Sequence, residues 1–118
     1  MPVARDTIDL LQGSLDLLVL KTLSWGPMHG FGIARWLRQL TDDALQVEEG
    51  SLYPALYRMA NKGWIASEWR VTENNRRAKY YRLTPTGRRH LTAESSQWLR
   101  FAGLMIEVLG MREQPAAQ

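Results

Sequence analysis

The chain has no cysteine and only two histidines, His29 and His90, among its 118 residues. Without cysteine there is no disulfide, no thiol nucleophile and no cysteine zinc site. The two histidines are far apart and have no HxxxH-type partner, so we expect neither a metal nor a cofactor. No apolar run approaches about 18 residues, so we expect no membrane span. We also expect no signal peptide, which leaves a cytoplasmic protein as the simplest interpretation.

The sequence also lacks the signatures of an enzyme. It contains no convergent set of acids and bases and no glycine-rich phosphate loop. The spacing of Gly30 and Gly32 is too short a pattern to indicate one. We therefore expect a protein that binds a partner and does not catalyse a reaction.

The chain does have enough apolar residues for one modest core, with 45% hydrophobic residues and five tryptophans. Its basic residues are concentrated in one third of its length, since residues 58–89 hold nine Lys/Arg against two Asp/Glu. A contiguous basic block is the expected footprint of a polyanionic partner, although a solvated basic surface is the common alternative.

Apolar periodicity predicts helices over residues 10–25 and 29–41. The first is apolar on two sides, so one side should face the core and the other a partner chain. Residues 45–48 alternate and predict a minimal strand. We interpret Trp25, Trp36, Trp64 and Trp69 as core or hairpin packing.

A third helix should open at Ser51, which is a good N-cap, with Gly50 breaking the chain before it. Pro54 is tolerated in a first turn, whose N–H groups have no partner inside the helix. Gly63 should end the helix. The side chains outside the apolar stripe carry hydroxyls, phenols or cations, which suit phosphates and base edges. They are Ser51, Tyr53, Tyr57, Arg58 and Lys62.

Residues 64–71 and 79–83 predict two strands of a β-hairpin. The polar loop between them contains Asn74 and Asn75, which are typical of turns, followed by Arg76 and Arg77. Thr84 and Pro85 then predict the start of a long helix that ends near Leu109. This helix is too apolar for a small monomer to cover, so a twofold partner is expected.

This order of elements predicts a winged helix-turn-helix of mostly α, α+β class, with a long C-terminal dimerisation helix. We expect residues 1–84 to form the DNA-binding domain and residues 85–118 the dimerisation helix and tail. In such a fold the third helix enters the major groove of double-stranded DNA, and the hairpin contacts the adjacent backbone or minor groove. The alternative is a winged-helix adaptor that binds proteins without binding duplex DNA. RNA binding is disfavoured because no exposed aromatic platform is evident.

Specific stretches of the chain resemble the PadR family of transcriptional regulators. They are LLQGSLDLLVLKTL, GPMHGFGIA, EEGSLYPALYRM, KGWIASEW and ENNRRAKYYRLTPTGRRHL, followed by the single long C-terminal helix. The resemblance covers about residues 10–110 and is similar to the subgroup with one C-terminal helix. It implies a homodimeric repressor, released from DNA by a small aromatic or cationic effector.

The candidate residues follow from the pattern and the resemblance together. For DNA binding they are Ser51, Tyr53, Pro54, Tyr57, Arg58, Lys62, Asn75, Arg76, Arg77, Lys79 and Tyr80. Strand alternation sends either Tyr80 or Tyr81 inward, so only one of the two can be a surface contact. For dimerisation they are Leu15, Leu91, Trp98, Ala102, Met105, Ile106 and Leu109. Trp98 is also the candidate ligand residue, because related drug sensors stack planar molecules on a tryptophan of this helix. The alternative is that Trp98 only fills the dimer core.

Overall fold

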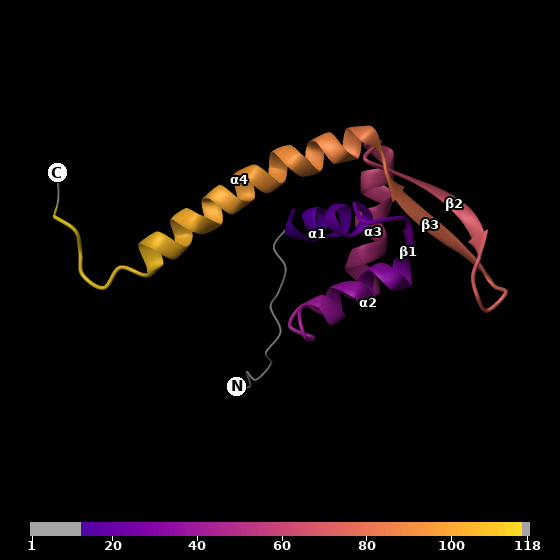
Figure 1. Cartoon of the computed structure of the whole chain (residues 1–118), viewed down its shortest axis with the longest axis horizontal. Coiled ribbons are helices and arrows are strands. Elements are labelled where there is room, and N and C mark those ends of the chain that lie inside the picture. The colour runs from indigo at the N-terminus through magenta and orange to yellow at the C-terminus, as the bar shows by residue number, and fades with distance from the viewer. Residues whose placement is uncertain (1–12, 117–118) are drawn as a thin grey trace.

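The computed structural model describes residues 13–116. Helices and a small sheet form a body from which one long helix extends (Figure 1). The elements are α1 (Ser14–Leu23), β1 (Met28–His29), α2 (Gly30–Leu40), α3 (Glu49–Asn61), β2 (Ile65–Val71), β3 (Arg77–Leu83) and α4 (Pro85–Leu109). This order confirms the expected winged helix-turn-helix with a long C-terminal helix. The expected start of the first helix, residues 10–12, lies outside the described residues.

The sheet is antiparallel, with strand order β1-β3-β2. The long hairpin of β2 and β3 is the wing (residues 65–83), and it projects from the body in Figure 1. The strand expected at residues 45–48 is wrong, because that segment has no regular structure and β3 pairs with Met28 and His29. The alternating pattern that suggested a strand arises because the Val47 side chain is buried in the core, while the backbone of this segment pairs with no strand.

The core lies where α1, α2, α3 and the inner end of the sheet meet. Its buried side chains are mainly aliphatic, as the apolar stripes of the helices predict. The largest fully buried ones are Leu20, Ile33, Leu52, Leu56, Met59, Val19 and Thr22. Thr22 satisfies its hydroxyl by donating to the Leu18 carbonyl at 2.8 Å, so its burial leaves no unpaired polar group.

Helix α3 begins two residues earlier than expected. The Glu48 carbonyl accepts from the N–H groups of Ser51 at 3.0 Å and Leu52 at 2.9 Å, so Ser51 is inside the helix and is not its N-cap. Gly50 does not break the chain, and Pro54 sits in the interior of the helix. Pro54 cannot donate to the carbonyl four residues earlier, but that carbonyl belongs to exposed Gly50, where water can replace the missing donor.

The end of α3 and the start of α4 are joined by hydrogen bonds. Gly63 has a φ of +78°, which confirms it as the residue that ends α3. The Thr84 hydroxyl donates to the carbonyls of Gly63 at 2.6 Å and Trp64 at 2.9 Å. The same hydroxyl accepts from the Gly87 N–H at 2.9 Å, which confirms Thr84 as the N-cap of α4. The recognition-helix candidate and the long helix therefore meet at a fixed junction.

Beyond this junction, α4 leaves the body as an extended arm (Figure 1). Leu91, near its start, is buried to 7% exposure against the core. Further along, we call residues 98–109 the arm, and all of its large apolar side chains are exposed. They are Trp98, Leu99, Phe101, Leu104, Met105, Ile106, Val108 and Leu109. Among the described helices, none is long and apolar enough to span a membrane.

Candidate nucleic-acid interface

Helix α3 presents its polar side chains to solvent, as its sequence predicts. Leu52, Ala55, Leu56 and Met59 face inward and are buried. The opposite side carries Ser51, Tyr53, Pro54, Tyr57 and Arg58, all exposed. Tyr57 is 72% exposed, so its phenol is free to donate to a phosphate or a base edge.

Tyr53 is held more tightly than Tyr57. Its ring lies against Gly30 at the start of α2, where an added Cβ would be only 2.8 Å from both Cε1 and the phenol oxygen. Burial raises the pKa of Tyr81 in β3, and the neighbouring Tyr53 raises it further. The Tyr53 phenol therefore lies where α2, α3 and the sheet meet, and it is 42% exposed there.

Arg58 of α3 and Lys62 at its C-cap already have partners within the chain. The Arg58 guanidinium donates to the Asp16 carboxylate of α1 at 2.7 Å. The Lys62 ammonium lies 4.7 Å from the centre of the Trp64 ring, a cation–π distance. A DNA contact by Arg58 must therefore replace or share an ion pair, a condition that the sequence alone does not reveal.

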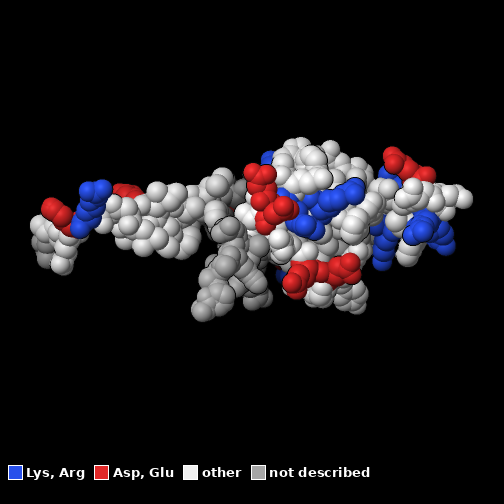
Figure 2. All heavy atoms as spheres, turned by 90° about the horizontal axis from the view of Figure 1, so that it is seen from below, with Lys and Arg blue, Asp and Glu red and all other residues white. Residues whose placement is uncertain are grey.

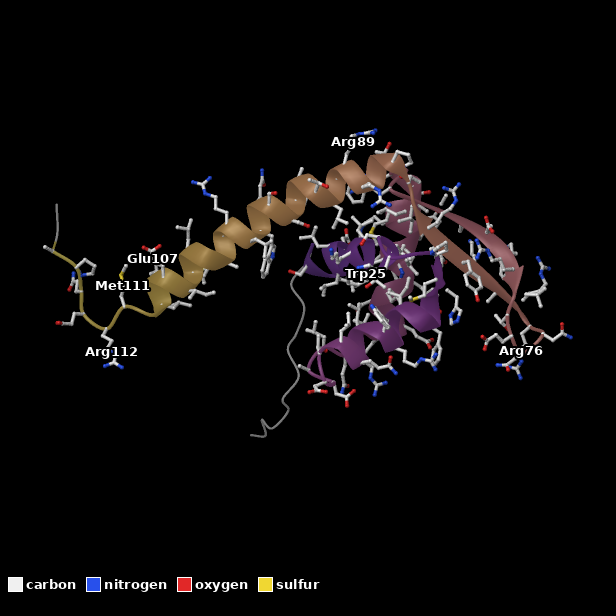
Figure 3. The ribbon with its side chains drawn as sticks, viewed as in Figure 1. Trp25, Arg76, Arg89, Glu107, Met111 and Arg112 are labelled. Atoms are coloured by element: carbon white, nitrogen blue, oxygen red, sulfur yellow. The ribbon has the colours of Figure 1, made fainter. Side chains whose placement is uncertain are left out.

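The wing turns at residues 72–76. Asn75 adopts a φ of +60°, which asparagine tolerates better than most residues. The Thr72 N–H donates to the Arg76 carbonyl at 2.6 Å. Arg76 lies at the tip, as Figure 3 shows, whereas Arg77 already belongs to β3 and pairs with Val71. Within residues 13–116, none of Arg76, Arg77 and Lys79 forms an ion pair.

Strand register sorts the wing residues onto two faces. The core-side face continues the buried side of the sheet and carries Ile65, Ser67, Trp69, Val71, Arg77, Lys79, Tyr81 and Leu83. The outer face carries Ala66, Glu68, Arg70, Ala78, Tyr80 and Arg82. Tyr81 is the buried tyrosine of the pair, with 8% exposure. Tyr80 is half-buried on the outer face, away from Arg77 and Lys79.

Tyr80 has close neighbours on the outer face. The His29 ring packs edge-on against it, with 5.3 Å between centroids, and the Arg70 guanidinium lies 5.1 Å from its ring centre. Arg70 also donates to the Glu68 carboxylate at 2.7 Å, and this bond holds the pKa of Glu68 below its usual value. The outer face therefore includes a negative charge.

Three tryptophans are more exposed than core packing would allow. Trp25 and Trp69 are each 58% exposed, and Trp36 is 37% exposed, so the expected burial of Trp25 and Trp36 is wrong. Trp25 and Trp36 instead pack edge-to-face on the surface, with 6.2 Å between ring centroids. Trp64 is half-buried and stacks on His90 at 3.7 Å. Composition alone does not separate these roles, because tryptophan is common in cores and at binding surfaces alike.

The candidate dimer residues divide into two sets. Leu91 lies in the core of its own chain and has little surface left for a second copy. Leu15 is half-buried against that core, and its place at an interface stays a prediction. Trp98, Met105, Ile106 and Leu109 are exposed on the arm, while Ala102 is half-exposed there. Trp98 keeps 46% of its surface, and its place at an interface or a ligand site stays a prediction.

Charge is distributed unevenly over the surface. In Figure 2, Lys and Arg side chains gather at the wing end and across the body, with separate acidic groups near them. Most of the arm carries no charged side chain in the same view, except near its far end. Within the described residues, no group of three His, Asp or Glu is placed to hold a metal ion. The wing is therefore suited to phosphates and the arm to an apolar partner.

Comparison with known proteins agrees with this geometry. Residues 19–93 match the model of the family described as "Transcriptional regulator PadR-like family". A transcriptional regulator of Mycobacterium tuberculosis is 42% identical over 84 residues, which cover 70% of this chain and 74% of that protein.

Solved structures show the same fold. A PadR family transcription regulator from Clostridium difficile is 29% identical, with a TM-score of 0.72 over 82% of this chain and 99% of that one. Bacillus subtilis PadR, solved in complex with operator DNA, is 21% identical, with a TM-score of 0.60 over 88% of this chain and 50% of that one. The chain thus spans half the length of the Bacillus subtilis protein. On the match to residues 19–93, this chain belongs to the PadR-like family of transcriptional regulators.

Proposed function

We propose that this protein is a cytoplasmic, homodimeric repressor that binds a pseudo-palindromic operator in double-stranded DNA. Helix α3 would enter the major groove, and the wing would contact the neighbouring backbone or minor groove. The observation that carries the proposal is the pairing of an exposed, hydroxyl-rich α3 surface with a wing in which Arg76, Arg77 and Lys79 have no ion-pair partner within residues 13–116. The operator complex of Bacillus subtilis PadR supports it by analogy of fold.

The proposed contacts have different roles. Ser51, Tyr53 and Tyr57 would bond phosphates and base edges, with Pro54 shaping the surface between them. Arg76, Arg77 and Lys79 would neutralise phosphates along the wing, and the Asn75 amide would donate a hydrogen bond to the backbone there. Arg58, Lys62 and Tyr80 remain proposed contacts, although each also has a partner in its own chain, which a DNA contact would replace or share.

The exposed arm supports a dimer. Monomeric proteins rarely expose a contiguous apolar surface of this kind, and a twofold partner covers it with the same surface from a second copy. Residues 1–84 would then be the DNA-binding part and residues 85–118 the dimerisation part. Because the hydrogen bonds at Thr84 hold α3 and α4 together, the geometry of the dimer would set the distance between the two copies of α3.

Trp98 is where we place the effector. An exposed indole on the arm, paired with its twin across a twofold axis, would stack a planar aromatic or cationic molecule. Binding there would change the angle between the two arms and release the operator. The alternative is that the two Trp98 side chains fill the dimer core and no effector binds.

The test is binding to a fragment of its own promoter and to a scrambled fragment, titrated across salt concentration, with the protein mass measured alongside. The proposal expects a dimer that prefers the promoter and binds more weakly as salt rises. If a well-folded dimer fails to bind any duplex at low salt, the repressor is refuted. A winged-helix adaptor that binds proteins then becomes the better interpretation.

A further inference from the structure

The distal part of the wing's core-side face is left uncovered by the rest of residues 13–116. Cross-strand partners project to the same side of a hairpin, so Trp69 lies beside Lys79 and Val71 lies beside Arg77. Trp69 is 58% exposed and Val71 is 65% exposed. An indole and an isopropyl group, each beside a cation, are therefore exposed to water. Exposure of apolar surface is unfavourable, and it indicates that a partner covers these side chains.

Trp69 and Arg77 are also in direct contact. The Arg77 guanidinium lies 5.1 Å from the centre of the Trp69 ring, in a cation–π arrangement. Stacking occupies the flat face of a guanidinium and leaves its N–H edges free to donate to an anion. The indole therefore positions the cation and contributes an apolar surface next to it.

The outer face of the wing differs in charge and in cover. It holds the Glu68 carboxylate in an ion pair with Arg70, and the ring of Tyr80 is packed by His29. The distal core-side face, made of Trp69, Val71, Arg77 and Lys79, includes no carboxylate. A polyanion would therefore be attracted by the distal core-side face, whereas the outer face would also repel it through Glu68.

The core-side face also points toward the exposed end of α3. Tyr81 belongs to this face and is buried against the core. Tyr53 of α3 is close enough to raise the pKa of Tyr81, and it is itself partly exposed. The α3 surface therefore lies beside the inner end of the core-side face at Tyr81, and the distal residues continue that same face along the wing, so that one extended ligand such as a duplex could touch both.

We propose that the core-side face is the side of the wing that contacts duplex DNA, and that Trp69 packs its indole against deoxyribose in the groove beside α3. Sugar rings are the apolar part of the DNA backbone, and apolar side chains are often used in the minor groove. Arg77 and Lys79 would hold the phosphates next to that sugar. This inference rests on the proposed function and adds to it a contact residue and an orientation of the wing.

The first experiment replaces Trp69 with Ala or Phe and measures affinity for the duplex that the unmodified protein binds. We expect Trp69→Ala to weaken binding about three- to tenfold, the range for loss of one aromatic packing contact. Its salt dependence should stay close to that of the unmodified protein, because no charge is removed. Trp69→Phe should keep most of the affinity. Unchanged affinity of the folded Trp69→Ala protein would overturn the proposal.

A charge-matched pair tests the orientation of the wing. Arg77→Ala and Arg70→Ala each remove one positive charge from the same hairpin, but from opposite faces. We expect Arg77→Ala to reduce the salt slope by about one and Arg70→Ala to change it little. Equal losses, or a greater loss with Arg70→Ala, would contradict the proposed orientation.

Fluorescence provides a readout that a merely structural role of Trp69 would not move. Packing on DNA should alter the tryptophan emission of the unmodified protein, and Trp69→Phe should remove most of that change. If emission changes equally in Trp69→Phe, Trp69 does not touch the DNA. A protein that binds no duplex at all would instead refute the proposed function, so the two failures are distinguishable.

Discussion

Arg58 of α3 and Asp16 of α1 form an ion pair of 2.7 Å between the Nη2 and Oδ1 atoms. The Asp16 side chain is 15% exposed, whereas that of Arg58 is 44% exposed. The pair therefore lies at the boundary between the core and the proposed DNA surface. It links α3, the proposed recognition helix, to α1, and it pairs a cation that we predict from the sequence to contact DNA.

Asp16→Asn should release Arg58. We expect the free energy of unfolding to fall by about 1 kcal/mol, the upper end of the range for ion pairs at a protein surface, because this pair is only partly exposed. Affinity for DNA should rise severalfold, since a negative charge is lost and a cation becomes available. Titration across salt measures both effects, and the gain should shrink in an Arg58→Ala background. No change in affinity or salt slope would show that Arg58 does not reach DNA.

Replacing Arg76 and Arg77 together with Ala should weaken binding to every duplex. Each cation that neutralises a phosphate contributes about one unit to the salt slope, so the double variant should lose about two. The measurement compares affinities for promoter and scrambled fragments at several salt concentrations. An unchanged slope would remove the wing from the mechanism.

Tyr53→Ala should cost more affinity on the operator than on random DNA. A direct base-edge contact is worth about 1–3 kcal/mol of discrimination. Tyr53→Phe is the finer variant, because it keeps the ring against Gly30 and removes only the hydroxyl. Equal losses on both duplexes would make Tyr53 a contact to the DNA backbone alone.

Leu109→Asp should yield monomers or insoluble protein. Leu109 is 74% exposed on the arm, so a carboxylate there would be buried only if a second copy covers it. Sedimentation measures the outcome. Ser96→Asp adds the same charge to an exposed position on the opposite, polar side of α4 and should remain a dimer. A soluble Leu109→Asp dimer would show that the arm is not the interface.

Gly87→Ala should destabilise the protein by about 1–3 kcal/mol, because the added methyl overpacks the junction. Its Cβ would clash with the backbone oxygen of Trp64, which forces α4 away from the residue just before β2. Gly103→Ala is the matched control, since nothing lies within 4 Å of its added Cβ. Alanine is the better helix former, so this control should gain up to about 1 kcal/mol. Thermal or denaturant unfolding measures the stability of both variants. Equal stability would contradict the close packing of Gly87 against Trp64.

Local signals predicted most of the fold. Thr84 and Pro85 marked the start of α4, Gly63 marked the end of α3, and the alternating strands marked the wing. Such signals depend on a few neighbouring residues, so they can be read from the chain. The start of α3 was misplaced for the same reason. Ser51 has the chemistry of an N-cap, but the helix extends back to Glu49.

The site was only partly predictable. The basic block and the polar side of α3 follow from the sequence, because charge and periodicity are properties of the chain. The partners of Arg58 and Lys62 do not follow, since Asp16 lies 42 residues away from Arg58. The sequence pattern predicts a packing role for Trp69, but its side chain is 58% exposed. Its exposure depends on how far the hairpin projects beyond the body, which the local sequence does not specify.

By itself, the sequence determined the order of elements, the family resemblance, the basic wing and the apolar length of α4, because all of these reside in local pattern. The tertiary structure alone decided which cations remain free of ion pairs within residues 13–116, which side of the wing carries Trp69, and that Leu91 serves its own core. The physical reason is that burial and pairing depend on distances between segments far apart in the chain, which only packing brings together.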